Sequence, residues 1–267
     1  MFKDRKIQLL QVGNLSAAIL TIIINGLANT LPIGGNYTGE ISDNIPNLFT
    51  PAGITFAIWG LIYVLIILFV VYLAKDLFKK EKKTKSFLEK ISYFFILASL
   101  ANISWIFLWH YEQIILSIIP MCVLFLSLLA IYLRLNIGID KVSIKEKIFL
   151  HIPISVYLGW ITVATIANVT AVLVRIGWNG FGISEEIWAI LVIAVATFIT
   201  ILVLLKRKDY AYSAVIIWAL IGIYIKRITD DAIYGVQTQI AYTAIIAISA
   251  ILIIGSITIF LNYSKKR

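Results

Sequence analysis

Long apolar stretches without charged residues recur along the whole chain and constrain its fold more than any other feature. About 20 consecutive apolar residues are enough to cross the hydrocarbon core of a bilayer as an α-helix. Strands of a transmembrane barrel would instead alternate in polarity over about 10 residues, and these stretches do not alternate. The sequence therefore predicts an all-α polytopic membrane protein with eight spans: Ile7–Leu31, Pro51–Ala74, Ile91–His110, Ile114–Leu133, Ile148–Val174, Ile187–Leu205, Tyr210–Ile225 and Ile240–Leu261.

The composition agrees with this class and narrows the choice of partners. Hydrophobic residues make up 61% of the 267 residues, whereas a soluble domain is about half apolar. The formal net charge is +9, but the basic residues gather between the apolar stretches, above all in Lys75–Lys90. Basic loops of this kind set membrane topology and meet anionic headgroups. We therefore expect membrane lipids as partners and no nucleic acid.

The basic residues of the loops also predict the orientation of the chain. Lys and Arg are abundant after the second, fourth and sixth spans and in the tail after the eighth. The loop Pro32–Thr50 has none, and the loop after the fifth span has only Arg175. By the positive-inside rule, both termini are cytoplasmic. We expect a multi-pass protein of the cell membrane.

One basic pair departs from this rule. Lys226 and Arg227 fall on the predicted outer side of the seventh span, and Asp230 and Asp231 follow at helical spacing. Oppositely charged residues three or four positions apart on a helix attract each other. We expect these four residues to form an exposed charge cluster with little effect on stability, because exposed pairs contribute only about 0–1 kcal/mol.

Ionisable and catalytic groups are missing from the predicted spans. No Asp, Glu, Lys or Arg lies near the centre of a span, where proton-coupled carriers, pumps and voltage sensors place them. The single cysteine, Cys122, excludes a disulfide framework. His110 and His151 fall on opposite sides of the membrane and cannot form one metal site. We therefore predict no catalytic residue, no metal and no cofactor, and an enzyme is the less favoured class.

Three predicted spans instead carry aromatic, amide and small side chains along one helical face. Residues spaced by three, four or seven positions share a face of an α-helix. The nine stripe residues are Phe56, Trp59 and Tyr63 in the second span, Asn102 and Trp105 in the third, and Tyr157, Trp160, Ala164 and Asn168 in the fifth. Each stripe is predicted to lie in the outer half of the membrane.

The tryptophans admit two interpretations. Trp and Tyr form belts at membrane interfaces, and we assign three residues to such a belt: Trp109, Trp178 and Trp188. Trp59, Trp105 and Trp160 lie about two turns or more below the helix ends, where a buried indole N–H needs a partner. Asn102 and Asn168 could accept those hydrogen bonds or bind a ligand. The stripes therefore either line a ligand pocket or hold the helices together.

The first outer loop is the most distinctive connection. Pro32–Thr50 contains Gly34, Gly35 and Asn36, which favour tight turns. A loop of this length is uncommon unless it has a function or structure of its own. It either covers the mouth of a pocket or is an ordinary surface connection.

At these residues the sequence resembles the tryptophan-rich sensory protein family, TspO/MBR, which is related to the translocator protein. The second helix of that family opens with prolines followed by aromatic residues, and TPAGITFAIWGLIY is similar here. The third-helix pattern LNxxWxxxF resembles ANISWIFLW, and the fifth-helix pattern PYLxWxxFATxLN resembles VYLGWITVATIAN, with Val156 in place of the proline. The resemblance covers about residues 7–175.

The resemblance implies a five-helix bundle over residues 1–175, followed by three additional transmembrane helices over residues 176–267. It implies that the bundle binds a flat apolar ligand, a porphyrin-like tetrapyrrole or a sterol-like lipid, in a pocket that the first outer loop closes. The pocket tryptophans correspond to Trp59 and Trp160, and we expect all nine stripe residues to contact the ligand. The expected function is a membrane binding or sensory protein. The alternative is a facilitated transporter of such a ligand or of a lipid. Whether the chain forms a homodimer is left open.

Overall fold

A computed structural model of the chain describes residues 2–79, 81, 83–229 and 233–264. The described part is helical and contains no β-strand. Its long helices are α1 (Phe2–Thr30), α3 (Ile58–Ala74), α5 (Phe94–His110), α6 (Ile114–Arg134), α8 (Ile152–Arg175), α9 (Glu185–Arg207), α10 (Tyr210–Ile228) and α11 (Thr238–Ser264). The short ones are η1 (Ile33–Gly35), α2 (Thr38–Asp43), η2 (Gly53–Ala57), α4 (Lys85–Ile91), α7 (Ile144–Glu146), η3 (Lys147–His151) and η4 (Gly180–Gly182).

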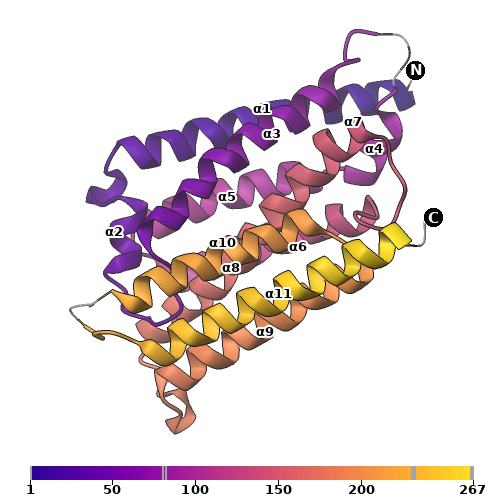
Figure 1. Cartoon of the computed structure of the whole chain (residues 1–267). Coiled ribbons are helices and arrows are strands. Elements are labelled where there is room, and N and C mark those ends of the chain that lie inside the picture. Colours follow the sequence, from indigo (N-terminus) through magenta and orange to yellow (C-terminus); the bar gives the residue numbers. More distant parts are fainter. Residues whose placement is uncertain (1, 80, 82, 230–232, 265–267) are drawn as a thin grey trace.

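The long helices form one bundle (Figure 1). Within the described residues, seven helical segments are long and apolar enough to cross a membrane, and the pair α4–α5, bent by 49°, makes an eighth if it is one span. The prediction of an all-α polytopic membrane protein is thus confirmed. The bend follows Ile91, the predicted start of the third span, at Ser92, which has a φ of 52°. Such a left-handed residue ends a helix.

The helices that follow residue 175 pack closely on those that precede it. Gly159 of α8 lies against α10, where an added Cβ would be 3.1 Å from Val215 Cβ and 3.2 Å from the Tyr212 carbonyl oxygen. Small residues of this kind let membrane helices approach each other. One cluster of buried side chains runs through all eight long helices. The division of the chain at residue 175 stays a prediction.

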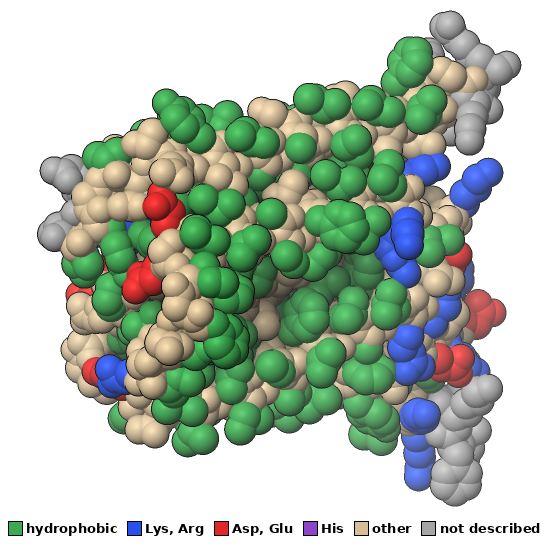
Figure 2. Space-filling view, turned by 90° about the horizontal axis from the view of Figure 1, so that it is seen from below, with side chains coloured by type: hydrophobic (Ala, Val, Ile, Leu, Met, Phe, Trp, Pro, Cys, Tyr) green, Lys and Arg blue, Asp and Glu red, His purple; other side chains and the backbone are tan. Residues whose placement is uncertain are grey.

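Charged and apolar side chains occupy different parts of the surface. Figure 2 shows Lys and Arg gathered at one end of the molecule and hydrophobic side chains over its middle. Figure 1 places both ends of the chain near this basic end. This distribution suits a membrane protein, and the assignment of the basic end to the cytoplasm is our prediction.

Cysteine labelling tests this orientation. Single substitutions Asn36→Cys, Lys83→Cys, Lys141→Cys and Lys266→Cys are made in a Cys122→Ala background and exposed to a membrane-impermeant maleimide on intact cells. Only the first is expected to react, because the other three lie in predicted cytoplasmic loops or in the tail. Permeabilised cells, in which all four should react, provide the control. Labelling of Lys83→Cys in intact cells would contradict the orientation.

The expected charge cluster after α10 is wrong for Arg227. This side chain is fully buried, and its guanidinium lies 5.9 Å from the ring centre of Tyr234. The chain folds back over it, because the Gln237 amide donates to the Arg227 carbonyl at 2.8 Å. Lys226 instead reaches Asp43 of α2, with 3.0 Å between Nζ and Oδ1. The other two members, at positions 230 and 231, lie outside the described residues.

Candidate ligand-binding site

A cavity lies among α3, α5, α6 and α8, beneath the loop that carries α2. Its volume is about 60 Å³, well below the range of about 300–1,000 Å³ found for ligand pockets, so a ligand of that size would need the lid and the wall side chains to move apart. Met121 and Leu124 of α6 are part of its wall. Seven of the nine stripe residues line it: Phe56, Trp59, Asn102, Trp105, Trp160, Ala164 and Asn168.

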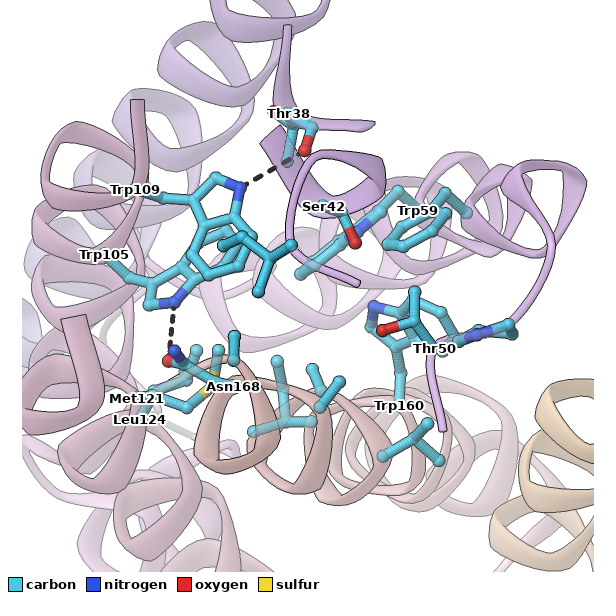
Figure 3. Close-up of a pocket in the computed structure, with 18 of the residues that line it drawn as sticks. Thr38, Ser42, Thr50, Trp59, Trp105, Trp109, Met121, Leu124, Trp160 and Asn168 are labelled. Atoms are coloured by element: carbon cyan, nitrogen blue, oxygen red, sulfur yellow. Dashed lines mark hydrogen bonds between the residues drawn. The ribbon is translucent and has the colours of Figure 1, made fainter. Parts of the chain in front are cut away.

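Two aromatic groups face each other across this cavity (Figure 3). On one side Trp160 packs edge-to-face against Trp59, with 6.2 Å between ring centres, and against Phe56 at 5.7 Å. On the other side Trp105 and Trp109 are stacked, with ring centres 5.1 Å apart and an angle of 21°. The helical stripes predicted from spacing therefore converge on one space.

The two remaining stripe residues lie behind the wall. The Tyr63 ring stacks on Trp59 with 5.7 Å between ring centres. The ring of Tyr157 meets Trp59 edge-to-face at 6.2 Å and is buried in the core. Neither tyrosine lines the cavity. These residues position the indole of Trp59, and the prediction that they contact a ligand stays untested.

Trp109 does not belong to an interfacial belt, and that prediction is wrong. Its side chain is only 5% exposed, and it lines the cavity. Its Nε1 donates to the Thr38 carbonyl oxygen of α2 at 3.2 Å. The reason is that the first outer loop folds over the end of α5 and covers this indole.

That loop forms a lid on the cavity. Thr38 and Ser42 of α2, with Ile45, Asn47 and Thr50, line its outer side. The C-terminal end of the lid is shaped by the Asn47 carboxamide oxygen, which accepts hydrogen bonds from the amides of residues 49 and 50 at 3.1 and 2.8 Å. The sequence left open whether the loop covers a pocket, and in the structure it does.

His110 fastens the lid to the end of α5. Its Nε2 lies 2.8 Å from Thr38 Oγ1, and its Nδ1 lies 3.1 Å from the Ile33 carbonyl oxygen and 3.0 Å from that of Asn36. The imidazole is buried. Sequence reasoning placed this histidine at the interface and gave it no role in the lid.

Helix α10 contacts η2 and the residue before it, which form the entrance of the cavity opposite the lid. Sequence reasoning missed this contact. Trp218 Nε1 donates to the Thr55 carbonyl oxygen of η2 at 2.8 Å, and the Ala52 amide donates to the Gly222 carbonyl oxygen at 3.0 Å. The pair Lys226–Asp43 adds a contact to α2. Trp218 and Gly222 are four positions apart, and that shared helical face was the signal in the sequence.

The asparagines have structural partners. Asn168 Oδ1 accepts from Trp105 Nε1 at 3.0 Å, and its Nδ2 donates to Ser117 Oγ at 2.9 Å, so it ties α5 and α6 to α8. Asn102 Oδ1 accepts from Asn25 Nδ2 of α1 at 2.6 Å. These contacts correspond to the interpretation that polar stripe residues hold helices together.

Two hydrogen-bond donors in the cavity wall are unpaired within the described part of the chain. Trp160 Nε1 and Asn102 Nδ2 are buried and have no hydrogen-bond partner within the described part of the chain. Among the same residues, no three of His, Cys, Asp and Glu lie close enough together to hold a metal ion. The cavity can thus offer apolar contact and hydrogen-bond donation.

Comparison with known families adds an independent observation. A family model described as TSPO-like protein matches residues 11–258. Comparison with curated proteins and with solved structures found no match. The matched region contains all three aromatic motifs and extends through α9, α10 and most of α11. It therefore covers both the cavity and the helix that holds its entrance, and the chain belongs to the TSPO-like protein family.

Proposed function

We propose that this membrane protein binds a flat, mostly apolar ligand of the tetrapyrrole or sterol-like class in the cavity beneath the lid. The observation that carries the proposal is the indole N–H of Trp160. The side chain is 2% exposed, lines the cavity, and its Nε1 has no partner among the described residues. A buried donor without a partner costs about 1–3 kcal/mol, which a ligand with an acceptor atom would recover.

The chemistry of the wall supports this class of ligand. Indole rings offer flat apolar faces, and contact with them stabilises a complex by roughly 25 cal/mol per Å² before association costs. The Asn102 amide nitrogen is a second buried donor without a partner in the described chain. A ligand with a planar ring system and one or two acceptor oxygens would satisfy both the rings and the donors.

Access to the cavity requires the lid to move. Thr38 links α2 to the end of α5 through two hydrogen bonds, with His110 and with Trp109. Each such bond contributes only about 0.5–1.5 kcal/mol net. The lid can therefore open without loss of the long helices. Closure over a bound ligand would convert occupancy into a change at the outer surface, which suits a sensory protein.

The inner side of the cavity favours binding over passage. Buried side chains fill the bundle between Met121 and Leu124 and the basic end of the molecule, among them Phe69, Phe95 and Leu128. A facilitated transporter would need these residues to part during each cycle. Ligand efflux from vesicles with and without the protein tests that alternative, and faster efflux with the protein would favour it.

A titration of the purified protein in lipid nanodiscs tests the proposal. A panel with a porphyrin, a linear tetrapyrrole and a sterol is added while tryptophan fluorescence is recorded. We expect saturable quenching by at least one class. Trp160→Phe should weaken binding roughly fivefold through loss of one hydrogen bond, and Trp188→Phe should leave affinity unchanged. An absence of saturation with the whole panel, or equal affinity of Trp160→Phe and wild type, would contradict it.

A further inference from the structure

A second hollow opens between α8 and α9, separate from the cavity under the lid. Its volume is about 790 Å³. Its walls are the outer half of α8, the connection with η4, the first half of α9 and, at the upper edge, Asn47–Phe49. Helix α9 packs on α10 and α11, which leaves a space on its α8 side. We call this space the α8–α9 groove.

The interior of the groove is apolar, because the hydroxyl groups of its threonines are already hydrogen-bonded within α8. The hydroxyls of Thr165 and Thr170 donate to carbonyl oxygens one turn earlier in α8, at 2.7 and 2.9 Å. These two threonines therefore present methyl groups, and no free hydroxyl donor, to the groove or its walls. Among the described residues, no buried side-chain atom without a partner belongs to its lining. The groove interior therefore suits a hydrocarbon chain.

The length of the groove matches one leaflet of a bilayer. Its lining on α8 runs from Thr165 to Val174, which is roughly 14 Å at about 1.5 Å per residue. Half of the hydrocarbon core is about 15 Å. Its walls include Val169 and Val195, which are 41% and 57% exposed and would face lipid. A transmembrane helix from another protein would need the full thickness, whereas an acyl chain needs only this half.

The mouth of the groove carries one sign of charge. Among the described residues that line it, Glu185 is the charged one, and no Lys or Arg lines it. The Tyr234 hydroxyl donates to Glu185 Oε2 at 2.8 Å and so fixes the carboxylate. Trp178 and Trp188 lie in the same lining with 5.2 Å between their ring centres. A carboxylate beside indole faces attracts an ammonium group and repels an anionic headgroup.

We propose that the α8–α9 groove is a lipid site. It holds an acyl chain of a phospholipid from the leaflet that contains the lid, with the amine headgroup at Glu185. The proposal is independent of the ligand in the cavity, because the hydrocarbon interior, the groove length and the single negative charge carry it.

Native mass spectrometry of the protein released from nanodiscs tests the site. The discs contain equal amounts of phosphatidylethanolamine and phosphatidylglycerol, so the retained lipid reports its own headgroup. The wild type is expected to retain phosphatidylethanolamine in preference. Val169→Trp, which fills the groove from an exposed position, should remove the retained lipid. Val64→Trp on α3, 55% exposed in the wild type, is the matched control and should retain it.

The headgroup contact has its own pair of variants. Glu185→Gln should reduce the preference for phosphatidylethanolamine roughly fivefold, the upper end for an exposed charge pair. Glu186 is the neighbouring acid in the same first turn of α9, and its side chain does not line the groove. Glu186→Gln should therefore keep the preference. Unchanged lipid retention in Val169→Trp, equal loss in Val64→Trp, or a preference for phosphatidylglycerol would overturn the proposal. A dimer mass that Val169→Trp abolishes would assign the groove to a second copy of the chain instead.

Discussion

Gly222→Ala is expected to destabilise the protein by about 2 kcal/mol, because overpacking in a tight core costs about 1–3 kcal/mol. A Cβ at this position of α10 would overlap Thr55 Oγ1 and lie 2.9 Å from Pro51 Cβ. Helix α10 would then have to withdraw from the entrance segment η2. Thermal unfolding of the purified protein should show a lower midpoint.

Two further variants make this prediction specific. Gly60 of α3 has open space where a Cβ would be added, so Gly60→Ala should leave the midpoint unchanged or raise it. Thr55→Ala removes the nearest obstructing atom and should restore part of the stability lost in Gly222→Ala. Equal midpoints for Gly222→Ala and wild type would show that α10 does not hold the entrance.

Trp160→Ala is expected to weaken ligand binding by about 2 kcal/mol or more, roughly 30-fold, the size found for central aromatic anchors. Alanine removes both the indole face and the N–H, whereas Trp160→Phe keeps most of the apolar area. We expect the same order, Ala worse than Phe, at Trp59. Equilibrium binding of a porphyrin, followed by its absorption spectrum, measures the affinities.

The control for these variants is Trp188→Ala, which changes an indole outside the cavity lining. Its affinity should equal that of the wild type. Thermal unfolding of each variant separates loss of binding from loss of folding, since a Trp→Ala change in a core can cost about 3–5 kcal/mol. If Ala and Phe at residue 160 both bind as tightly as the wild type, the indole ring is not part of the binding surface.

Much of the fold could be predicted from the sequence, because a membrane imposes simple rules. Long stretches without charges must be helices, and the helical period fixes which residues share a face. The stripe of Trp59 and that of Trp160 are therefore predictable from the sequence of each helix alone. Their convergence could be expected only through the family resemblance, because spacing does not give the rotation of one helix relative to another.

The errors share a physical cause. Trp109 and Arg227 stand at helix ends, where the sequence predicts contact with the interface or with water. In the structure, connecting segments fold back over both side chains. The second span, predicted over Pro51–Ala74, is found over Gly53–Ala74, but its first turns form η2 and α3 begins only at Ile58. Tertiary contacts of loops decide these features, and no local pattern encodes them.

The central claim is that the cavity lined by Trp59 and Trp160 is the ligand site, and one binding measurement tests it most directly. Porphyrin is titrated into nanodiscs with wild-type protein or with the Trp59→Ala, Trp160→Ala double variant, and the shift of the porphyrin absorption band is recorded. The account predicts saturable binding to the wild type and only unsaturated partition into the lipid with the double variant. Saturable binding of equal affinity to both proteins would contradict it and place the ligand elsewhere.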